Sequence, residues 1–342
     1  MERETGTYRV GLTYNLKSGK AQKHEDDEAE LDDRQTVDAI AQAIRSAGCE
    51  VVLMEATGQI VQMLDHQKID IVFNFAEGLK GRGREAQVPA LLNLMGIPFT
   101  GSDETTLGVA LDKALAKRVV AYDGIRTPRF QVFFTGQEPI NPKLGFPVIV
   151  KPNSEGSSKG IQEKAIAHTP EEVRKLVGYL VREYHQPALV EEFIHGREFT
   201  VGLIGNGENL QVLPVMEIHF QKGGEEGFYS YRVKKHADEF TRTTCPAKLD
   251  PKQKKAIEQF ARKVFQVLEC KDVARIDLRW NDKDGRPTFI EINPLPGLID
   301  GYSDLTLIAR AAGMPYPQLI LSILNAALLR QGMAPVQNRG GE

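Results

Sequence analysis

The sequence predicts an α/β protein with an α+β C-terminal part, organised in three sections. Roughly the first hundred residues alternate apolar strand-like runs with amphipathic helix-like stretches. This pattern restarts after GIPFTGSDETT (96–106), and two strands joined by a glycine turn follow near the C-terminus. We therefore expect sections at 1–105, 106–189 and 190–342.

The composition limits the classes of function that are to be expected. At 342 residues, with 41% hydrophobic and 26% charged residues, the chain is typical of a globular protein with a sizeable core. A net charge of -3 gives no reason to expect nucleic acid or an anionic membrane as a partner. The three cysteines form no CxxC pair, and no apolar signal core or membrane-length run occurs. We expect a cytoplasmic protein.

The first section reads as a β/α unit. Strands are expected at 8–13, 50–54 and 69–75, with amphipathic helices between and after them, which predicts a parallel sheet. The acidic segment 24–33 (HEDDEAELDD) lies between the first strand and the first helix. We expect a solvated loop there, and a metal or cation site is the alternative.

The second and third sections are expected to contain further strands and helices. In the second, we expect helices at 107–122 and 173–184 and strands at 130–134 and 146–151. In the third, we expect a hairpin of 188–194 with 198–206 across His195-Gly196, a helix at 252–269, strands at 273–280 and 287–293, and two closing helices. The polar segment 221–240 lacks periodicity, and long loops of this kind are often functional lids.

Polar side chains gather on one face of the last two strands. Arg275 and Asp277 share a face of VARIDLRW, and Glu291 and Asn293 share a face of FIEINPLPGL. A turn centred on Gly285 would bring the strands together in an antiparallel pair. Two carboxylates and an amide oxygen form a hard ligand set suited to Mg²⁺. A surface salt bridge between Arg275 and Glu291 is the alternative.

A phosphate site is indicated further upstream. Lys151 ends the strand FPVIVK, and the small polar loop NSEGSSKG follows at once. The N–H groups of such a loop can fold over a triphosphate. Lys113 lies on the preceding helix, where a lone lysine is usually a solvated surface residue.

One motif points elsewhere. GRGREA (81–86) matches a dinucleotide fingerprint, but EGLK separates it from the preceding strand, so the tight turn is missing. A dinucleotide-dependent oxidoreductase is therefore an unfavoured alternative. The P-loop, zincin, hydrolase-elbow and kinase signatures do not occur.

These residues resemble the ATP-grasp superfamily and, within it, the D-alanine–D-alanine ligase family. The resemblance covers roughly 69–330 and is carried by GIPFTGS, LDK (111–113), KPNSEGSSKGI, LVEEFIHGREFTVGLIGN, FYSYRVKK, CPAKL, RIDLRW and EINPLPG. It implies an ATP-grasp fold, with an N-terminal β/α domain and with ATP held between a central lid domain and a C-terminal domain that carries the metal site. A homodimer is also implied by the resemblance.

The resemblance assigns roles to individual positions. Around the ATP phosphates it places Lys113 and Lys151, with the Ser157-Ser158 loop over them and Lys234 at the terminal phosphate. At adenine it places Glu191 and the backbone of Phe193 and Ile194, and at the ribose it places Glu198. At the reaction centre it places Asp277, Glu291 and Asn293 on two Mg²⁺, for which Mn²⁺ can substitute, and Arg275 and the Gly297 amide on the reacting carboxylate, with Ser157 nearby.

The substrate side departs from the family pattern. Glu77 stands where relatives have a histidine, Arg82 and Arg84 lie nearby, and Lys235 replaces a lid tyrosine. Either Tyr302 or Ser303 takes the place of a serine that grips the second carboxylate. These changes alter several charges in one pocket, which favours a different acid or amine, although binding of D-alanine stays open.

The implied function is ATP- and Mg²⁺-dependent joining of a carboxylate to an amine through an acyl phosphate, as in D-alanine–D-alanine ligases. The same chemistry on a different amino-acid or peptide pair is an alternative. A nucleotide-binding module that has lost ligation is another, and the intact polar set at Lys151, Arg275, Asp277, Glu291 and Asn293 argues against it.

Overall fold

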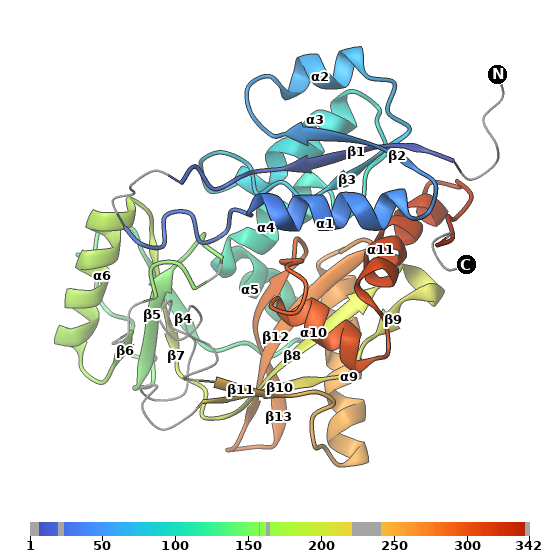
Figure 1. Ribbon diagram of the computed structural model, residues 1–342. Coiled ribbons are helices and arrows are strands. Elements are labelled where there is room, and N and C mark those ends of the chain that lie inside the picture. Colours follow the sequence, from blue (N-terminus) through green and yellow to red (C-terminus); the bar gives the residue numbers. More distant parts are fainter. Residues whose placement is uncertain (1–6, 20–23, 157, 162–164, 221–240, 339–342) are drawn as a thin grey trace.

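The computed structural model describes residues 7–19, 24–156, 158–161, 165–220 and 241–338, in which three sheets are arranged along the chain (Figure 1). The predicted positions Ser157, Lys234 and Lys235 and the predicted lid at 221–240 lie outside the described residues.

The N-terminal part is built on a three-stranded parallel sheet, which confirms the prediction. The strand order is β2–β1–β3, with β1 at Arg9–Tyr14, β2 at Glu50–Glu55 and β3 at Ile71–Asn74. The helices here are α1 (Arg34–Arg45), α2 (Ile60–His66), α3 (Gln87–Leu94) and the short 3-10 helix η1 (Arg84–Ala86). Sequence patterning does not predict α2, which has two buried residues in seven.

The central part carries a four-stranded sheet of order β4–β7–β5–β6. Its strands are β4 (Phe130–Phe133), β5 (Val148–Pro152), β6 (Ile166–Ala167) and β7 (Ala188–Glu192), and its helices are α4 (Glu104–Leu111), α5 (Lys113–Tyr122) and α6 (Pro170–Tyr184). The single helix predicted at 107–122 is wrong. Asp112 leaves the helical conformation, and its side chain accepts from the Leu115 amide, so it caps a new helix.

The C-terminal part contains a six-stranded sheet of order β11–β10–β8–β12–β13, with β9 paired to β8. The strands are β8 (Gly196–Ile204), β9 (Gln211–Val212), β10 (Met216–Phe220), β11 (Thr241–Thr244), β12 (Val273–Asn281) and β13 (Arg286–Asn293). The helical elements are η2 (Gly207–Asn209), α9 (Pro251–Val267), α10 (Asp304–Ala311) and α11 (Tyr316–Arg330). The predicted antiparallel pair β12–β13 is confirmed.

The hairpin predicted for 188–206 is wrong. β7 pairs with β4 and β5, whereas β8 pairs with β10, β12 and β9. Gly196 sits at φ 141° between them, where a Cβ would lie 1.8 Å from the Trp280 carbonyl oxygen. The chain therefore passes from the central sheet to the C-terminal sheet at His195-Gly196.

The C-terminal sheet has one apolar and one polar face. Alternate residues of β8 and β12, among them Phe199, Val201, Ile276 and Leu278, pack on α9 residues such as Ile257 and Phe265. Side chains on the other face are free to be polar, because β-strand residues alternate between faces. α11 packs instead against α1, which ties the C-terminal helices to the N-terminal core.

The acidic segment 24–33 is not a solvated loop, which corrects the prediction. Asp26 and Asp32 are 5% and 6% exposed. Asp26 Oδ2 accepts from the Gly160 amide at 2.7 Å and from the Tyr184 hydroxyl at 2.9 Å, and the His24 ring stacks on Tyr184. Figure 1 shows the segment before α1 reaching the central part. One backbone amide and one hydroxyl donate to the Asp26 carboxylate, and these hydrogen bonds offset the free-energy cost of burying it.

We expect Asp26→Asn to loosen this contact. An asparagine oxygen cannot serve both donors with the charge-assisted strength of a carboxylate, so the free energy of unfolding should fall by about 1–3 kcal/mol. Amide hydrogen exchange at Gly160 should accelerate. Glu25→Gln, at an exposed position of the same segment, is the control. Unchanged exchange at Gly160 in the Asp26 variant would contradict the contact.

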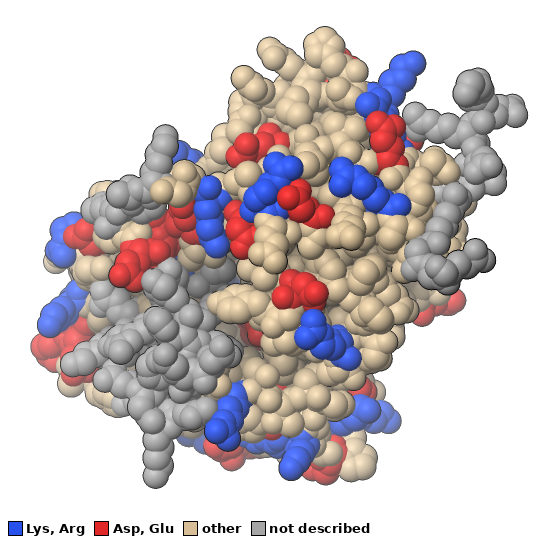
Figure 2. Space-filling model, in the orientation of Figure 1, with Lys and Arg blue, Asp and Glu red and all other residues tan. Residues whose placement is uncertain are grey.

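No single helix in the described part of the chain is both long and apolar enough to cross a membrane. α10 and α11 meet that test only as a pair bent by 104°. Both helices contribute buried side chains to the N-terminal core. On the face shown in Figure 2, acidic and basic side chains are interspersed across the surface.

Candidate active site

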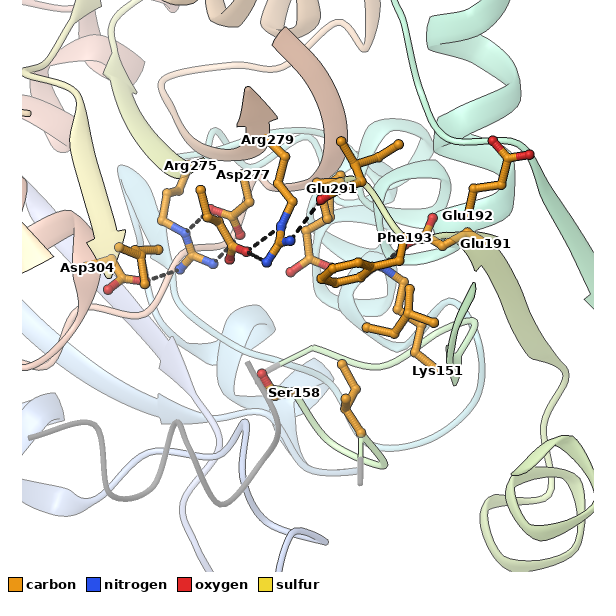
Figure 3. Close-up of a pocket in the computed structure, with 16 residues that line it drawn as sticks. Lys151, Ser158, Glu191, Glu192, Phe193, Arg275, Asp277, Arg279, Glu291 and Asp304 are labelled. Atoms are coloured by element: carbon orange, nitrogen blue, oxygen red, sulfur yellow. Dashed lines mark hydrogen bonds and ion pairs between the residues drawn. The ribbon is translucent and has the colours of Figure 1, made fainter. Parts of the chain in front are cut away.

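The polar face of β12 and β13 forms one wall of the site (Figure 3). Asp277 lies opposite Glu291, and Arg275 lies opposite Asn293, so the predicted shared face is confirmed. Arg275 donates to both oxygens of Asp277, at 3.1 and 2.9 Å, and Asn293 Nδ2 donates to Asp277 Oδ2 at 3.2 Å. This geometry turns the amide oxygen of Asn293 away from Asp277.

Arg275 is held between two carboxylates. Besides Asp277, its Nη1 lies 3.6 Å from Asp304 Oδ2, at the start of α10. The alternative salt bridge of Arg275 with Glu291 is not among the ion pairs of the described residues. Burial lowers the pKa of Arg275, but the charges of Asp277 and Asp304 outweigh it and raise that pKa, so Arg275 stays cationic.

A buried lysine–glutamate group forms the facing wall. Lys151 on β5 lies 2.6 Å from Glu191 Oε1, and Lys117 on α5 lies 2.9 Å from Glu191 Oε2. All three side chains are at most 4% exposed. Burial alone would raise the pKa of Glu191, but the charges of Lys117 and Lys151 lower it overall. Sequence analysis missed Lys117, although it lies one helical turn after Lys113 on the same face of α5.

Lysines of α5 also reach β13. Lys113 Nζ lies 3.3 Å from Glu291 Oε2 and donates to the Glu155 carbonyl oxygen in the Gly/Ser loop. Lys117 Nζ donates to the Ile290 carbonyl oxygen at 2.7 Å. Lys113 is 7% exposed, so the solvated-lysine alternative is wrong.

The segment between the two sheets lies beside an unpredicted arginine. Arg279 Nε and Nη2 donate to Glu198 Oε2 at 2.8 and 2.6 Å, and Nη1 donates to the Ile194 carbonyl oxygen at 2.9 Å. The guanidinium carbon lies 4.6 Å from the centre of the Phe193 ring. The signal for Arg279 was present, because it follows Arg275 and Asp277 at period two.

One pocket brings most of these residues together. Its lining contains nine predicted residues: Lys151, Ser158, Glu191, Phe193, Ile194, Glu198, Arg275, Asp277 and Glu291. They come from the central and C-terminal sheets, from the segment that links these sheets and, for Ser158, from the Gly/Ser loop after β5. Sequence analysis did not single out Arg279 or Asp304, which also line it.

The predicted substrate residue Glu77 lies in an acidic cluster of the N-terminal part. Carboxylate oxygens of Glu30, Glu77 and Glu85 lie within 4.8 Å of one another. Arg84 donates to Glu30 at 2.6 Å and to the Ser154 carbonyl oxygen at 2.9 Å, so its buried guanidinium links this cluster to the Gly/Ser loop. Burial, followed by the neighbouring carboxylates, raises the pKa of Glu77 well above its usual value. Burial likewise raises the pKa of Glu85 to about 7.

The other predicted substrate residues in the described part of the chain do not line this pocket. Arg82 is 70% exposed and pairs with Asp112 at 2.8 Å. Tyr302 is 51% exposed. The Ser303 hydroxyl accepts from the Ile299 amide at 3.0 Å, and a Cβ on Gly297 would lie 3.0 Å from Ser303 Oγ. Gly297 therefore lets the backbone pass close to Ser303.

Asp32 gives a pH-dependent stability that can be measured. Burial raises its pKa from 3.8 to about 7. Its contribution to folding is complete below pH 3.8 and is lost as the pH rises to about 7, because the buried carboxylate must ionise. We expect Asp32→Asn to raise the free energy of unfolding at pH 8 by on the order of 1–3 kcal/mol and to change it little near pH 4. Chemical denaturation at both pH values tests this, with exposed Asp38→Asn as the control. Equal effects at both pH values would contradict it.

Comparison with known proteins agrees with this architecture. A family model described as the D-ala D-ala ligase C-terminus matches residues 118–325. The uncharacterized protein y4sG of Sinorhizobium fredii is 36% identical over 85% of this chain and 86% of its own length. A D-alanine–D-alanine ligase of Bordetella avium is 33% identical over 83% of this chain and 86% of its own. The crystal structure of the D-alanine–D-alanine ligase from Bacillus anthracis superposes with a TM-score of 0.75 at 25% identity, covering 95% of this chain and 99% of that one.

The fold and the pocket define an enzyme of the ATP-grasp class, an ATP-dependent ligase that forms carbon–nitrogen bonds. The match to the family model spans more than half of the chain, and the relatives exceed 30% identity over most of it. The chain belongs to the D-alanine–D-alanine ligase family.

Proposed function

We propose that the enzyme activates the carboxylate of an amino acid or peptide as an acyl phosphate and joins it to an amine, with ATP and two Mg²⁺. The pair is D-alanine with itself or another amino-acid or peptide pair. The observation that supports this most strongly is the pocket that places the oxygen-rich hairpin β12–β13 opposite the buried Lys151 of the central part.

The donor set of the hairpin fits Mg²⁺. Asp277, Glu291 and Asn293 offer hard oxygen ligands from neighbouring strand positions, and Mg²⁺ usually takes one or two carboxylates from a protein. The ions would neutralise phosphate charge and polarise the phosphoryl oxygens.

Charge balance also supports a metal requirement. The cations around the pocket already have carboxylate partners: Lys151 and Lys117 with Glu191, Lys113 with Glu291, Arg275 with Asp277, and Arg279 with Glu198. A triphosphate therefore meets a site that is close to neutral. Additional positive charge is needed to hold its phosphates beside a second carboxylate.

The residues of the chain then have distinct tasks. Lys151 and Lys113 bind phosphate oxygens, and the Gly/Ser loop with Ser157 and Ser158 closes over them. Glu191 and the backbone at 193–194 bind adenine, and Glu198 accepts from the ribose hydroxyls. Lys234, from the segment 221–240, reaches the terminal phosphate.

Arg275 acts on the reacting carboxylate. Its charge, fixed between Asp277 and Asp304, meets the oxyanion that develops as the amine attacks, together with the Gly297 amide. The leaving group is phosphate, and closure of the 221–240 segment keeps water from the intermediate. Glu77, Arg82, Lys235, Tyr302 and Ser303 are the candidates for contacts with the two substrates.

A substrate panel tests the proposal. Purified enzyme with ATP and Mg²⁺ is offered D- and L-amino acids and short peptides, singly and in pairs, with ADP release and the mass of the joined product as readouts. We expect ADP release to require both an acid and an amine, and the joined product to have the summed mass of the two substrates minus one water. Absence of ADP release with every pair would contradict the proposal.

Assembly and location complete the proposal. We propose a cytoplasmic homodimer in which 1–105, 106–189 and 190–342 act as the N-terminal, central lid and C-terminal metal-binding domains. Light scattering of the purified protein tests the dimer, and a monomeric mass throughout the micromolar range would contradict it.

A further inference from the structure

Arg279 occupies an unusual place in the nucleotide pocket. Its side chain is 6% exposed, and it makes three hydrogen bonds to two different elements of the pocket, namely Glu198 on β8 and the carbonyl of Ile194 in the linking segment. The guanidinium plane also lies close to Phe193. A planar fork with fixed donors can hold two groups in one geometry, which a lysine cannot do. Figure 3 shows Arg279 pointing toward the middle of the pocket, near Glu291.

The contact with Arg279 uses only one of the two carboxylate oxygens of Glu198. Both hydrogen bonds from Arg279 end on Oε2, and no donor reaches Oε1 among the residues that the structure describes. A carboxylate oxygen that is held in place and keeps its acceptor capacity suits a hydroxyl donor. Glu198 follows the linking segment by four positions, so such a donor would belong to the part of a nucleotide next to its base.

Pairing with Arg279 also makes ionisation of Glu198 easier than burial alone would allow. Burial raises the pKa of Glu198, with further contributions from Asp277 and Glu291, and Arg279 opposes that rise. Without the arginine, a buried carboxylate beside two others would take up a proton more easily and accept hydroxyl hydrogen bonds less strongly.

We propose that Arg279 is a positioning residue for ribose recognition: it aligns Glu198 Oε1 with the ribose hydroxyls of the nucleotide and fixes the Ile194 carbonyl at the same time. This inference rests on the proposed function, because it takes the pocket to be the ATP site. It adds a specificity role for a residue that contacts Glu198 and not the reacting atoms.

Direct binding measurements separate this role from general stabilisation. Calorimetry with ATP and with 2′,3′-dideoxy-ATP, both with Mg²⁺, gives the ratio of the two dissociation constants without any ligation. We expect the unaltered enzyme to bind ATP more tightly than dideoxy-ATP. Arg279→Met should raise the dissociation constant of ATP by about tenfold and change that of dideoxy-ATP little. A purely structural loss would weaken both nucleotides equally.

Three further variants sharpen the test. Arg279→Lys keeps the charge and should lose most of the preference, because it cannot form the fork. Arg279→Met combined with Glu198→Gln should bind ATP no more weakly than the weaker single variant. Arg286→Met, at an exposed arginine on β13, is the control and should keep the full preference.

The possible failures are distinct. An unchanged ratio in Arg279→Met and Arg279→Lys, or equal weakening of both nucleotides, would overturn the positioning role and leave the proposed ligase intact. Failure of the unaltered enzyme to bind either nucleotide would overturn the proposed function and this inference with it. If Arg279→Met does not fold, the ratio in Arg279→Lys decides.

Discussion

Replacing Glu291 with glutamine is expected to lower the rate of ATP-dependent ligation by about 100- to 1000-fold. Glutamine keeps the shape of the side chain but removes a negative charge from the oxygen set that would hold Mg²⁺. Charge stabilisation by a bound metal is worth several kcal/mol, and each 1.4 kcal/mol or so is tenfold in rate. The same substitution also removes the ion pair with Lys113, whose Nζ lies 3.3 Å from Glu291 Oε2.

Rates of ADP release at increasing Mg²⁺ concentration check this expectation. The variant should need more Mg²⁺ for half-maximal rate and reach a lower plateau. Glu258→Gln, which alters a surface ion pair on α9, is the control for loss of a carboxylate elsewhere. A Glu291 variant with the full rate at ordinary Mg²⁺ concentration would show that the hairpin does not hold the metal.

Arg275→Lys is expected to lower kcat by about 100-fold although the positive charge is kept. Loss of one preorganised donor to an oxyanion costs about 10²–10³ in kcat. Arg275 reaches both oxygens of Asp277 and lies near Asp304, and a lysine ammonium cannot hold that bidentate geometry. The effect should fall on kcat more than on the KM for ATP, because the interaction strengthens as negative charge develops.

Comparison with Asp304→Asn makes this test more specific. Asp304 contacts Arg275 from α10 at 3.6 Å, so its loss should lower kcat less than Arg275→Lys does. Melting temperatures report whether either variant is unfolded. An Arg275→Lys enzyme with unchanged kcat would remove the arginine from the reaction centre.

Local sequence patterns predicted the parts of the site whose geometry is local. The face shared by Arg275, Asp277, Glu291 and Asn293 follows from period-two alternation and a glycine turn, and the strand register agrees with it. The parallel N-terminal sheet follows from alternating strands and helices in the same way.

The features that were missed depend on contacts between distant segments. Both partners of β7, strands β4 and β5, lie earlier in the chain, and nothing in ALVEEFI favours pairing with them over pairing with β8. Asp26 is buried because Gly160 and Tyr184, more than a hundred residues later, supply its donors. The acidic composition of 24–33 predicted a solvated loop, because the donors that satisfy a buried carboxylate come from distant segments and cannot be read from the local sequence. The break at Asp112 is a local signal that was overlooked, because aspartate favours the N-cap position.

Calorimetric titration of the unaltered enzyme with ATP, with and without Mg²⁺, tests most directly whether β12 and β13 hold Mg²⁺ against the nucleotide. We predict tight uptake of ATP that depends on Mg²⁺ and that Glu291→Gln largely abolishes. Binding of ATP that is equal with and without the ion, or that Glu291→Gln leaves unchanged, would contradict a Mg²⁺ site formed by β12 and β13.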